Sequence, residues 1–201
     1  MIGIMDYGIG NIQSVKNALE KINVSFVLIS RKADFSKADS IILPGVGSFG
    51  SAMQALNKKS LANPLKESVL SDKKPFLGIC LGMQLLFESS EENPDVKGLN
   101  IFEGIVKKFT KAKRVPQIGW NSLQKTNLES RLLKGIPQKG DFYYINSYFV
   151  VPKNNNMVTA YSKYSEKFPA VLEFGNIFAT QFHPEKSGNI GLKILENFSR
   201  F

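Results

Sequence analysis

The sequence predicts an α/β protein with a central, mostly parallel sheet that helices cover on both faces. In the first half of the chain, short apolar runs alternate with segments whose apolar residues recur at helical spacing, which is typical of parallel strands joined by helices. In the second half, strand-like runs follow one another through short turns, which indicates antiparallel strands added to the sheet. A chain of 201 residues can bury one sizeable core, so we expect a single domain over residues 1–201.

The elements of the first half follow from its apolar runs and its helical periods. The predicted strands are residues 2–6, 25–30, 40–45 and 75–79. The predicted helices are residues 11–22, a segment that begins at 50–56 and continues as a second helical stretch to about Leu70, and residues 81–90.

The second half is predicted to add strands and one closing helix. The predicted strands are residues 101–109, 142–151, 157–162, 170–174 and 177–183. Residues 189–201 have the apolar spacing of an amphipathic helix. The turn-rich stretch 127–141 is expected to be an excursion over the surface.

Cysteine usage and hydropathy favour the cytoplasm. The chain has one cysteine, so it cannot form an internal disulfide, and nothing indicates an oxidising compartment. The N-terminus resembles a buried strand entering a glycine turn, not a signal peptide. No apolar run approaches the length of a membrane span, so we expect no membrane contact.

The net charge of +9 raises the question of nucleic-acid binding. However, the lysines are scattered and mixed with acidic residues, and the chain has no arginine-rich run and no recognised nucleic-acid module. We therefore expect a solvated basic surface or an acidic partner protein, and no nucleic acid.

Two glycine-rich loops are excluded as nucleotide sites. "DYGIGN" (residues 6–11) follows the first strand, but Gln13 stands where a dinucleotide loop has its third glycine. It is therefore interpreted as a tight turn from strand to helix. "PGVGSFG" (residues 44–50) lacks the Lys-Ser/Thr pair of a phosphate loop.

The lone cysteine lies in a pattern typical of a nucleophile elbow. Cys80 sits between Gly78 and Gly82, at the junction of a predicted strand and a predicted helix. A sharp strand-to-helix turn would make side chains at both glycine positions collide, and it would expose the thiol at the carboxyl end of the strand. The N–H group of Leu81 could then stabilise an oxyanion.

A cysteine nucleophile needs a base, and the chain has one histidine, His183. Glu185 follows two residues later, and in an extended segment it would point the same way and fix the imidazole tautomer. Either the cysteine or the histidine alone would more often be structural. Together with the two glycines, they favour catalysis.

These motifs resemble those of the class I glutamine amidotransferases, and the resemblance implies that family's fold. "GICLGMQ" and "QFHPEKS" are similar to the two signatures of the family, and "LPGVGSFG" is similar to its oxyanion strand. More narrowly, the chain resembles the glutaminase subunits of imidazole glycerol phosphate synthases, which act in histidine biosynthesis. That resemblance covers nearly the whole chain and includes "DYGIGNIQSV", "GLNIFEG" and "VPQIGWN".

The resemblance implies a mechanism and a set of site residues. Cys80 would attack the side-chain amide of glutamine, His183 would pass a proton to the leaving ammonia, and Glu185 would orient His183. The oxyanion would be held by N–H groups in the set Val46, Leu81, Gly45 and Gly47. Glutamine would be bound by Gln84, Glu92, Ser147 and Tyr148. No cofactor and no metal ion are implied.

The resemblance also implies a partner. The family passes ammonia to a (β/α)₈-barrel cyclase/synthase subunit in a heterodimer, and the barrel makes imidazole glycerol phosphate and an aminoimidazole carboxamide ribotide. The positions that match the partner interface and its ammonia gate are Trp120, Asn121, Tyr143 and Lys186. A single tryptophan could equally be ordinary core, but the Gly-Trp-Asn setting favours the interface.

Two positions depart from the pattern of those subunits, because Gln117 and Asn146 stand where the subunits usually have histidine. The alternative is a paralogous glutaminase that supplies ammonia to a different amidotransferase, such as one that modifies surface sugars. A non-catalytic binding module and a cysteine hydrolase or protease on a related fold are the further possibilities. The complete set of Cys80, His183 and Glu185 argues against the binding module, and Gln84 with "PGVG" favours glutamine as the substrate.

Overall fold

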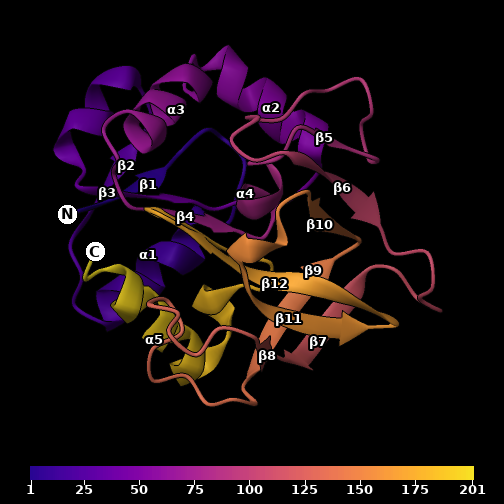
Figure 1. The fold of residues 1–201 in the computed structure, drawn as a ribbon. Coiled ribbons are helices and arrows are strands. Elements are labelled where there is room, and N and C mark those ends of the chain that lie inside the picture. The colour runs from indigo at the N-terminus through magenta and orange to yellow at the C-terminus, as the bar shows by residue number, and fades with distance from the viewer.

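The chain folds around one large sheet with helices on both faces, and the computed structural model describes all of residues 1–201 (Figure 1). The strands are β1 (Ile2–Met5), β2 (Phe26–Ile29), β3 (Ser40–Leu43), β4 (Phe76–Ile79), β5 (Ser89–Ser90), β6 (Gly104–Lys108), β7 (Gln117–Ser122), β8 (Gln124–Lys125), β9 (Asp141–Asn146), β10 (Tyr148–Pro152), β11 (Val158–Tyr164), β12 (Glu166–Phe174) and β13 (Ile177–Thr180). The α-helices are α1 (Ile12–Lys21), α2 (Phe49–Lys58), α3 (Ala62–Leu70), α4 (Leu81–Gln84) and α5 (Gly188–Phe198). Short 3-10 helices are η1 (Lys32–Lys37), η2 (Asn155–Met157) and η3 (Pro184–Lys186).

The main sheet has eight strands in the order β2-β1-β3-β4-β13-β12-β11-β8. The first five strands in this order, β2, β1, β3, β4 and β13, run parallel to one another. The last three, β12, β11 and β8, continue the sheet in antiparallel pairs. The predicted α/β class, with a mostly parallel sheet and added antiparallel strands, is therefore confirmed. β13 pairs antiparallel with β12, as predicted, and it also pairs parallel with β4, so it joins the added antiparallel strands to the parallel part of the sheet.

Two hydrophobic cores lie on the two faces of the sheet. Helices α1 and α5 cover one face, and α2 and α3 cover the other (Figure 1). Successive residues of a strand serve opposite cores: Ile41 and Leu43 of β3 pack on the side of α2 and α3, and Ile42 packs on the side of α1 and α5. Every residue of β3 is buried, which explains why this strand is an apolar run without alternation.

The helix predicted over residues 81–90 is much shorter, because α4 ends at Gln84. A later loop, which contains Leu99 and Ile101, forms hydrogen bonds with carbonyl groups that a longer helix would have used itself. The N–H of Leu99 donates to the carbonyl of Leu85, and the N–H of Ile101 donates to the carbonyl of Leu86. Gly98 makes this approach possible, since a Cβ there would lie 2.0 Å from the carbonyl oxygen of Phe87. A tertiary contact therefore overrides the local helical pattern.

The single strand predicted over residues 142–151 is two strands in two sheets. β9 pairs with β7 in a two-stranded ribbon, and β10 joins β6 and β5 in a three-stranded sheet. The break falls at Ser147, and the side-chain amide of Asn146 donates across it to the carbonyl of Tyr148 at 3.0 Å. The sequence suggested that all the later strands extend the main sheet. Some of them instead form these two small sheets beside it.

The stretch 127–141 runs over the surface in turns, as its turn residues indicated, but it also buries three apolar side chains. Leu132, Leu133 and Ile136 are buried in the core on the side of α1 and α5. The side-chain amide of Asn197, on α5, donates to the carbonyls of Leu132 and Lys134. The segment therefore covers α5 and has no regular structure of its own.

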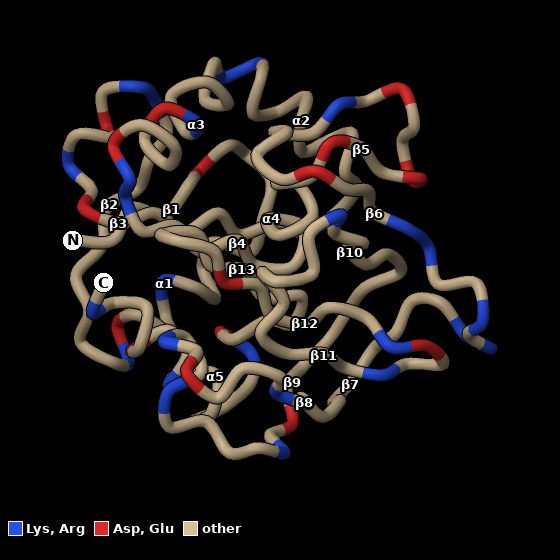
Figure 2. Tube along the Cα trace, in the orientation of Figure 1, with Lys and Arg blue, Asp and Glu red and all other residues tan.

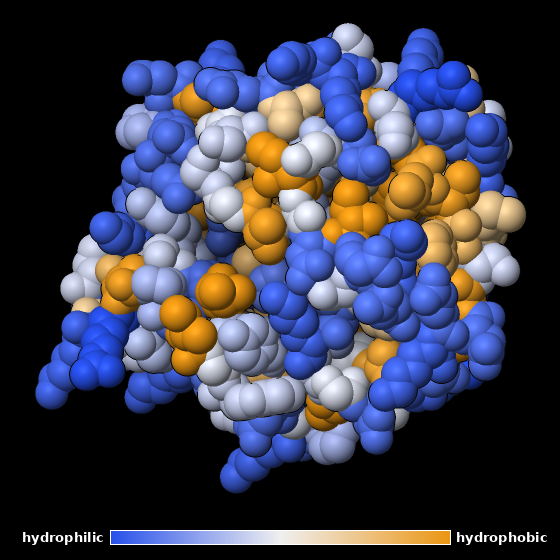
Figure 3. Space-filling model, turned by 180° about the vertical axis from the view of Figure 1, so that it is seen from behind, coloured by the Kyte–Doolittle hydropathy of each residue, from blue (hydrophilic) through white to orange (hydrophobic).

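Charged residues are spread around the periphery, and lysines and arginines alternate with acidic residues along the chain (Figure 2). Seen from behind, the surface is mainly hydrophilic, with apolar side chains gathered in limited areas (Figure 3). None of the helices has the length and hydropathy needed to cross a membrane.

The close approach at Gly98 gives a stability prediction. Gly98→Ala should lower the free energy of unfolding by about 3 kcal/mol, because the new Cβ would overlap backbone that cannot move aside. Gly175→Ala is the control: no atom lies within 4 Å of its added Cβ, and only its φ of +60° opposes the change, at about 1 kcal/mol. Urea unfolding curves compare the two, and equal losses would contradict the steric explanation of the short α4.

Candidate active site

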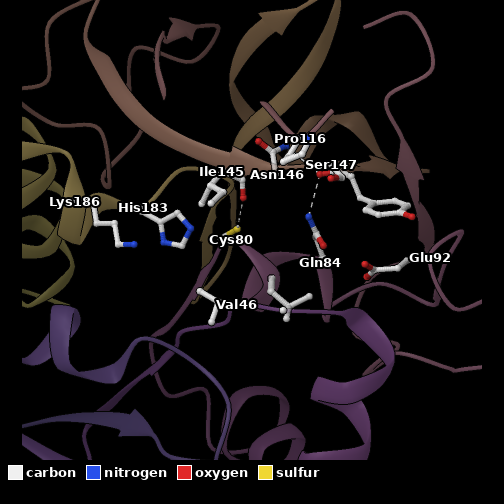
Figure 4. A pocket seen from close by; sticks show the side chains of 13 residues that line it. Val46, Cys80, Gln84, Glu92, Pro116, Ile145, Asn146, Ser147, His183 and Lys186 are labelled. Carbon is white, nitrogen blue, oxygen red and sulfur yellow. Dashed lines mark hydrogen bonds between the residues drawn. The ribbon is translucent and has the colours of Figure 1, made fainter. Parts of the chain in front are cut away.

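A pocket of about 280 Å³ opens where the carboxyl ends of β3, β4 and β13 meet the β9–β10 break. Adjacent parallel strands bring their carboxyl ends to the same edge of a sheet, which is where open α/β sheets place their sites. Figure 4 shows side chains from these elements converging on the pocket. The lining residues are Val46, Gly47, Cys80, Leu81, Gln84, Glu92, Pro116, Ile145, Asn146, Ser147, Tyr148, His183 and Lys186.

Cys80 occupies a strained turn between β4 and α4. Its φ of 54° and ψ of −107° lie outside the conformations that residues with side chains normally adopt. A Cβ at Gly78 would lie 2.7 Å from the carbonyl oxygen of Gly82, and a Cβ at Gly82 would lie 1.9 Å from the carbonyl oxygen of Leu43. The turn therefore requires both glycines, for the steric reason inferred from the sequence.

The Cys80 thiol has two weak contacts. Its Sγ lies 3.8 Å from the carbonyl oxygen of Ile145, to which it donates, and it accepts from the Nε2 of Gln181 at 3.6 Å. Figure 4 shows the thiol between His183 and Gln84, with a ring nitrogen of His183 pointing toward it. A base and a thiol thus face one pocket, which is the arrangement that nucleophilic catalysis needs.

His183 is held in place by Glu185 and by its own backbone. Its Nδ1 lies 2.7 Å from the Oε1 of Glu185, and both side chains are almost fully buried. The two residues meet through the 3-10 turn η3, and not along an extended segment as the sequence suggested. The N–H of His183 donates to the carbonyl of Tyr143, and the hydroxyl of Ser187 donates to the carbonyl of His183.

The electrostatic surroundings of His183 favour its protonated form. Burial lowers the pKa of His183, but the negative charges and hydrogen bonds of Cys80 and Glu185 outweigh burial and raise it to about 10. The buried Nε2 of His183 is directed toward Cys80 and makes no hydrogen bond with any other group of the chain. This nitrogen is therefore free to exchange a proton with a group in the pocket.

The positions expected to form an oxyanion site lie around one side of the pocket. Val46, Gly47 and Leu81 line it, and Gly45 is buried directly behind. The N–H of Val46 makes no hydrogen bond within the chain. A Cβ at Gly45 would lie 2.8 Å from the Cβ of Leu81 and 3.0 Å from the backbone nitrogen of Gly82, so the two segments pack closely.

The four residues expected to bind glutamine all line the pocket, namely Gln84, Glu92, Ser147 and Tyr148. The side-chain amide of Gln84 donates to the carbonyl of Tyr148 at 3.0 Å and to the Oε1 of Gln181 at 3.2 Å. One carboxylate oxygen of Glu92 accepts from the N–H of Phe49, in the first turn of α2, at 2.8 Å. That bond fixes the carboxylate at the pocket wall and leaves its other oxygen available.

Three of the four residues expected at a partner interface lie together. Trp120 is 60% exposed, so it is not core, and its ring meets that of Tyr143 edge to face at 6.0 Å. The ammonium of Lys186 lies 5.9 Å from the centre of the Tyr143 ring. Asn121 is on the opposite face of the β7–β9 ribbon, and its amide donates to the carbonyl of Lys163.

Gln117 and Asn146, the two departures from the family pattern, lie opposite each other in the β7–β9 ladder. Both are buried, and the side-chain oxygen of each has no hydrogen-bond donor. Asn146 also lines the pocket. The two departures thus form one cross-strand pair beside the pocket.

Sequence reasoning missed Gln181 and the carbonyl of Ile145. Gln181 is fully buried and contacts both Cys80 and Gln84. A signal for it was present, because it lies two residues before His183 in the same motif. The carbonyl of Ile145 could not be found, since any residue supplies one. No group of three or more His, Cys, Asp or Glu side chains is arranged to hold a metal ion.

The raised pKa of His183 gives a titration prediction. His183 is the only imidazole in the chain, so its ring signals in a carbon–proton NMR spectrum need no assignment. We expect the ring to stay protonated at pH 8 and to titrate near pH 10. Because the folded pKa exceeds the unfolded value, its stabilising contribution is complete below about pH 6.5 and is lost as the pH rises through 10.

Glu185→Gln should lower the titration midpoint of His183, because it removes a charge and a hydrogen bond that favour the imidazolium. Glu196→Gln is the matched control, since Glu196 lies on α5 and pairs with Lys193 and Arg200, not with His183. A wild-type midpoint near 6.5, or equal effects of the two variants, would contradict this description of the site.

Comparison with known proteins is consistent with the fold and the pocket. The family model described as "Glutamine amidotransferase class-I" matches residues 3–200. The chain is 46% identical over 201 residues to a Methanocaldococcus jannaschii protein named "Imidazole glycerol phosphate synthase subunit HisH", covering 98% of each chain. It is 47% identical over 204 residues to a Geobacillus kaustophilus protein of the same name, covering 98% of this chain and 95% of the relative.

Solved structures resemble the chain in fold. A structure described as a glutamine amidotransferase has a TM-score of 0.77 at 18% identity and covers 98% of both chains. PurLQS from Thermotoga maritima has a TM-score of 0.74 at 21% identity, covering 98% of this chain and 96% of that one. The family model spans nearly the whole chain, and the two relatives align with 98% of the chain. The chain therefore belongs to the class I glutamine amidotransferase family.

Proposed function

We propose that this chain is the glutaminase subunit of an imidazole glycerol phosphate synthase. The observation that carries the proposal is the pocket in which the strained Cys80 turn faces the His183–Glu185 pair, beside the free N–H of Val46. The names of the relatives at 44–47% identity support the choice of synthase. The pocket chemistry and the relatives thus support the same reaction.

In the first half of the reaction, the thiol proton of Cys80 passes to His183, and the sulfur attacks the side-chain carbonyl carbon of glutamine. A carbon–sulfur bond forms, and the negative charge on oxygen is stabilised by the N–H groups of Val46 and Leu81. His183 gives a proton to the departing nitrogen, the carbon–nitrogen bond breaks and ammonia leaves. Glu185 holds His183 by its Nδ1, so that Nε2 faces the thiol.

In the second half, water hydrolyses the glutamyl thioester. His183 accepts a proton from the water as the oxygen attacks. The carbon–sulfur bond then breaks, and His183 returns that proton to the sulfur, so that glutamate leaves and the Cys80 thiol is restored. The same oxyanion donors act in both halves, because each passes through a tetrahedral intermediate. The net reaction converts glutamine and water to glutamate and ammonia.

Substrate selection rests on the polar groups at the far end of the pocket. The carboxylate of Glu92 is placed to attract the α-ammonium group of glutamine. The backbone at Ser147 and Tyr148 supplies hydrogen bonds to the α-carboxylate, and Gln84 fixes the carbonyl of Tyr148. A protease would need an open groove for a peptide chain, whereas a pocket of about 280 Å³ suits one amino acid.

The relatives are named as a subunit of a synthase, which implies a complex. The finer proposal is a heterodimer with a (β/α)₈-barrel subunit that receives the ammonia. Its docking face would be the outer face of the β7–β9 ribbon with Trp120, Tyr143 and Lys186, since Lys186 also lines the pocket. A cytoplasmic location and one domain over residues 1–201 stay predictions.

The alternative, a paralogue that feeds a different amidotransferase, is not favoured. It rested on Gln117 and Asn146, but the relatives with the synthase name match the chain at about 45% identity over its whole length. The cross-strand pairing of the two residues indicates one local change beside the pocket. A binding module without catalysis is also disfavoured, because binding alone does not require a thiol and a buried His183–Glu185 pair that face one pocket.

Mixing the chain with the barrel subunit of an imidazole glycerol phosphate synthase tests the proposal. Glutamate release should rise strongly when the phosphorylated ribulosyl substrate of the barrel is added. Cys80→Ala should lower glutamine-dependent synthesis by about 10⁴-fold or more, while synthesis from added ammonium salt continues. Failure of stimulation, in protein whose Cys80 is still alkylated readily, would point to another synthase.

Trp120→Ala tests the docking face. It should weaken the complex about tenfold or more, because a large exposed aromatic side chain at the centre of an interface contributes strongly to affinity. The KM for glutamine should not change. Leu128→Ala removes another exposed apolar side chain, one that lies outside the proposed docking face, and is the control. Analytical ultracentrifugation measures both affinities, and equal values for the two variants would exclude Trp120 from the interface.

A further inference from the structure

Tyr7 is a buried tyrosine in the loop that follows β1, and the mechanism above does not use it. It belongs to the "DYGIGN" motif, the tight turn between β1 and α1. Its side chain is 1% exposed. β1 and β3 are parallel neighbours, so the residues that follow them lie side by side at the edge of the sheet where the pocket opens.

The phenol of Tyr7 is bonded to the segment that precedes Val46. Its hydroxyl donates to the carbonyl oxygen of Pro44 at 2.9 Å. That oxygen accepts no other hydrogen bond within the chain. The carbonyl belongs to the peptide unit that joins Pro44 to Gly45, so the bond fixes the plane of that unit.

The next residue is confined between the phenol and the Cys80 turn. A Cβ at Gly45 would lie 3.1 Å from the Tyr7 hydroxyl on one side and 2.8 Å from the Cβ of Leu81 on the other. With the preceding peptide plane fixed, the direction of the Val46 N–H depends on the two backbone torsions of Gly45 alone. Tyr7 and Leu81 restrict the space in which those torsions can change.

We propose that Tyr7 is a positioning residue for the oxyanion site, holding the Pro44–Gly45 peptide so that the N–H of Val46 points into the pocket. The proposal rests on the proposed function, because it concerns the stabilisation of the tetrahedral intermediate. Tyr7 itself does not touch the substrate. It acts through the backbone that it anchors.

The phenol can serve this purpose over a wide pH range. Burial raises the pKa of Tyr7, and the nearby Cys80 charge raises it further. The group therefore stays protonated and keeps donating to Pro44 when the thiol loses its proton. A serine or threonine at this position would not reach across from β1 to the segment after β3.

Tyr7→Phe is the test, because it removes the hydroxyl and keeps the ring in the core. An oxyanion donor acts in the transition state and not in the bound substrate, so kcat should fall while KM stays the same. Losing a complete donor costs about 10²- to 10³-fold in kcat. Tyr7→Phe keeps the N–H of Val46 but holds it less firmly, so kcat should fall about tenfold.

Tyr144→Phe is the matched control. Tyr144 is also fully buried, and its hydroxyl shares a hydrogen bond of 2.6 Å with the hydroxyl of Ser162, away from the pocket. Both variants lose one buried hydroxyl and should lose similar stability, about 1–2 kcal/mol. Only Tyr7→Phe should lower kcat.

Glutamate release is measured on the whole chain, alone and with the barrel subunit and its ribulosyl substrate. Each kcat is expressed per reactive Cys80, titrated with iodoacetamide, so that partial unfolding does not imitate the effect. The alkylation rate itself should be the same in wild type and Tyr7→Phe, because alkylation develops no oxyanion.

The proposal is supported if Tyr7→Phe loses about tenfold in kcat at constant KM and Tyr144→Phe keeps the wild-type value. It is overturned if Tyr7→Phe keeps its kcat, if KM rises instead, or if both variants lose kcat equally. Wild-type protein that alkylates but does not hydrolyse glutamine under either condition would defeat the proposed function itself, and the two failures are therefore distinguishable.

Discussion

The close contact between Gly82 and the end of β3 is the constraint on which the site depends. A Cβ at Gly82 would lie 1.9 Å from the carbonyl oxygen of Leu43, so only glycine lets the turn after β4 approach β3 this closely. Cys80 then takes a φ of 54° and brings its thiol to the carboxyl edge of the sheet. Because β3 and β13 flank β4, the Val46 segment and His183 reach the same place.

The sequence was sufficient to predict the features that depend on local sterics or on a unique residue. The alternation of apolar runs and helical periods predicted the α/β class, since a parallel sheet needs helices on both faces. The glycines on both sides of Cys80 predicted the nucleophile elbow, because a residue with a side chain does not fit at either position. His183 could be singled out because the chain has no other imidazole. Family resemblance then indicated Gln84 and Glu92, which line the pocket together.

The remaining features depend on contacts between distant segments, and no local pattern encodes them. The loop at Gly98 takes the carbonyls that would have extended α4. Residues 117–122 were not predicted as a strand; they form β7 by pairing with β9, and this strand puts Asn121 on the face away from Trp120. Glu185 reaches His183 through a 3-10 turn, whereas extended geometry was expected. Tyr7 approaches Pro44 only because β1 and β3 are neighbours.

Mass spectrometry of the enzyme during turnover tests the central claim most directly. Protein mixed with excess glutamine is quenched in acid within milliseconds, digested and searched for a γ-glutamyl group in thioester linkage. The account predicts one such group per chain, on the peptide that contains Cys80, and its disappearance on treatment with hydroxylamine. A chain that releases glutamate with no adduct at Cys80, or with the adduct on another residue, would contradict the account.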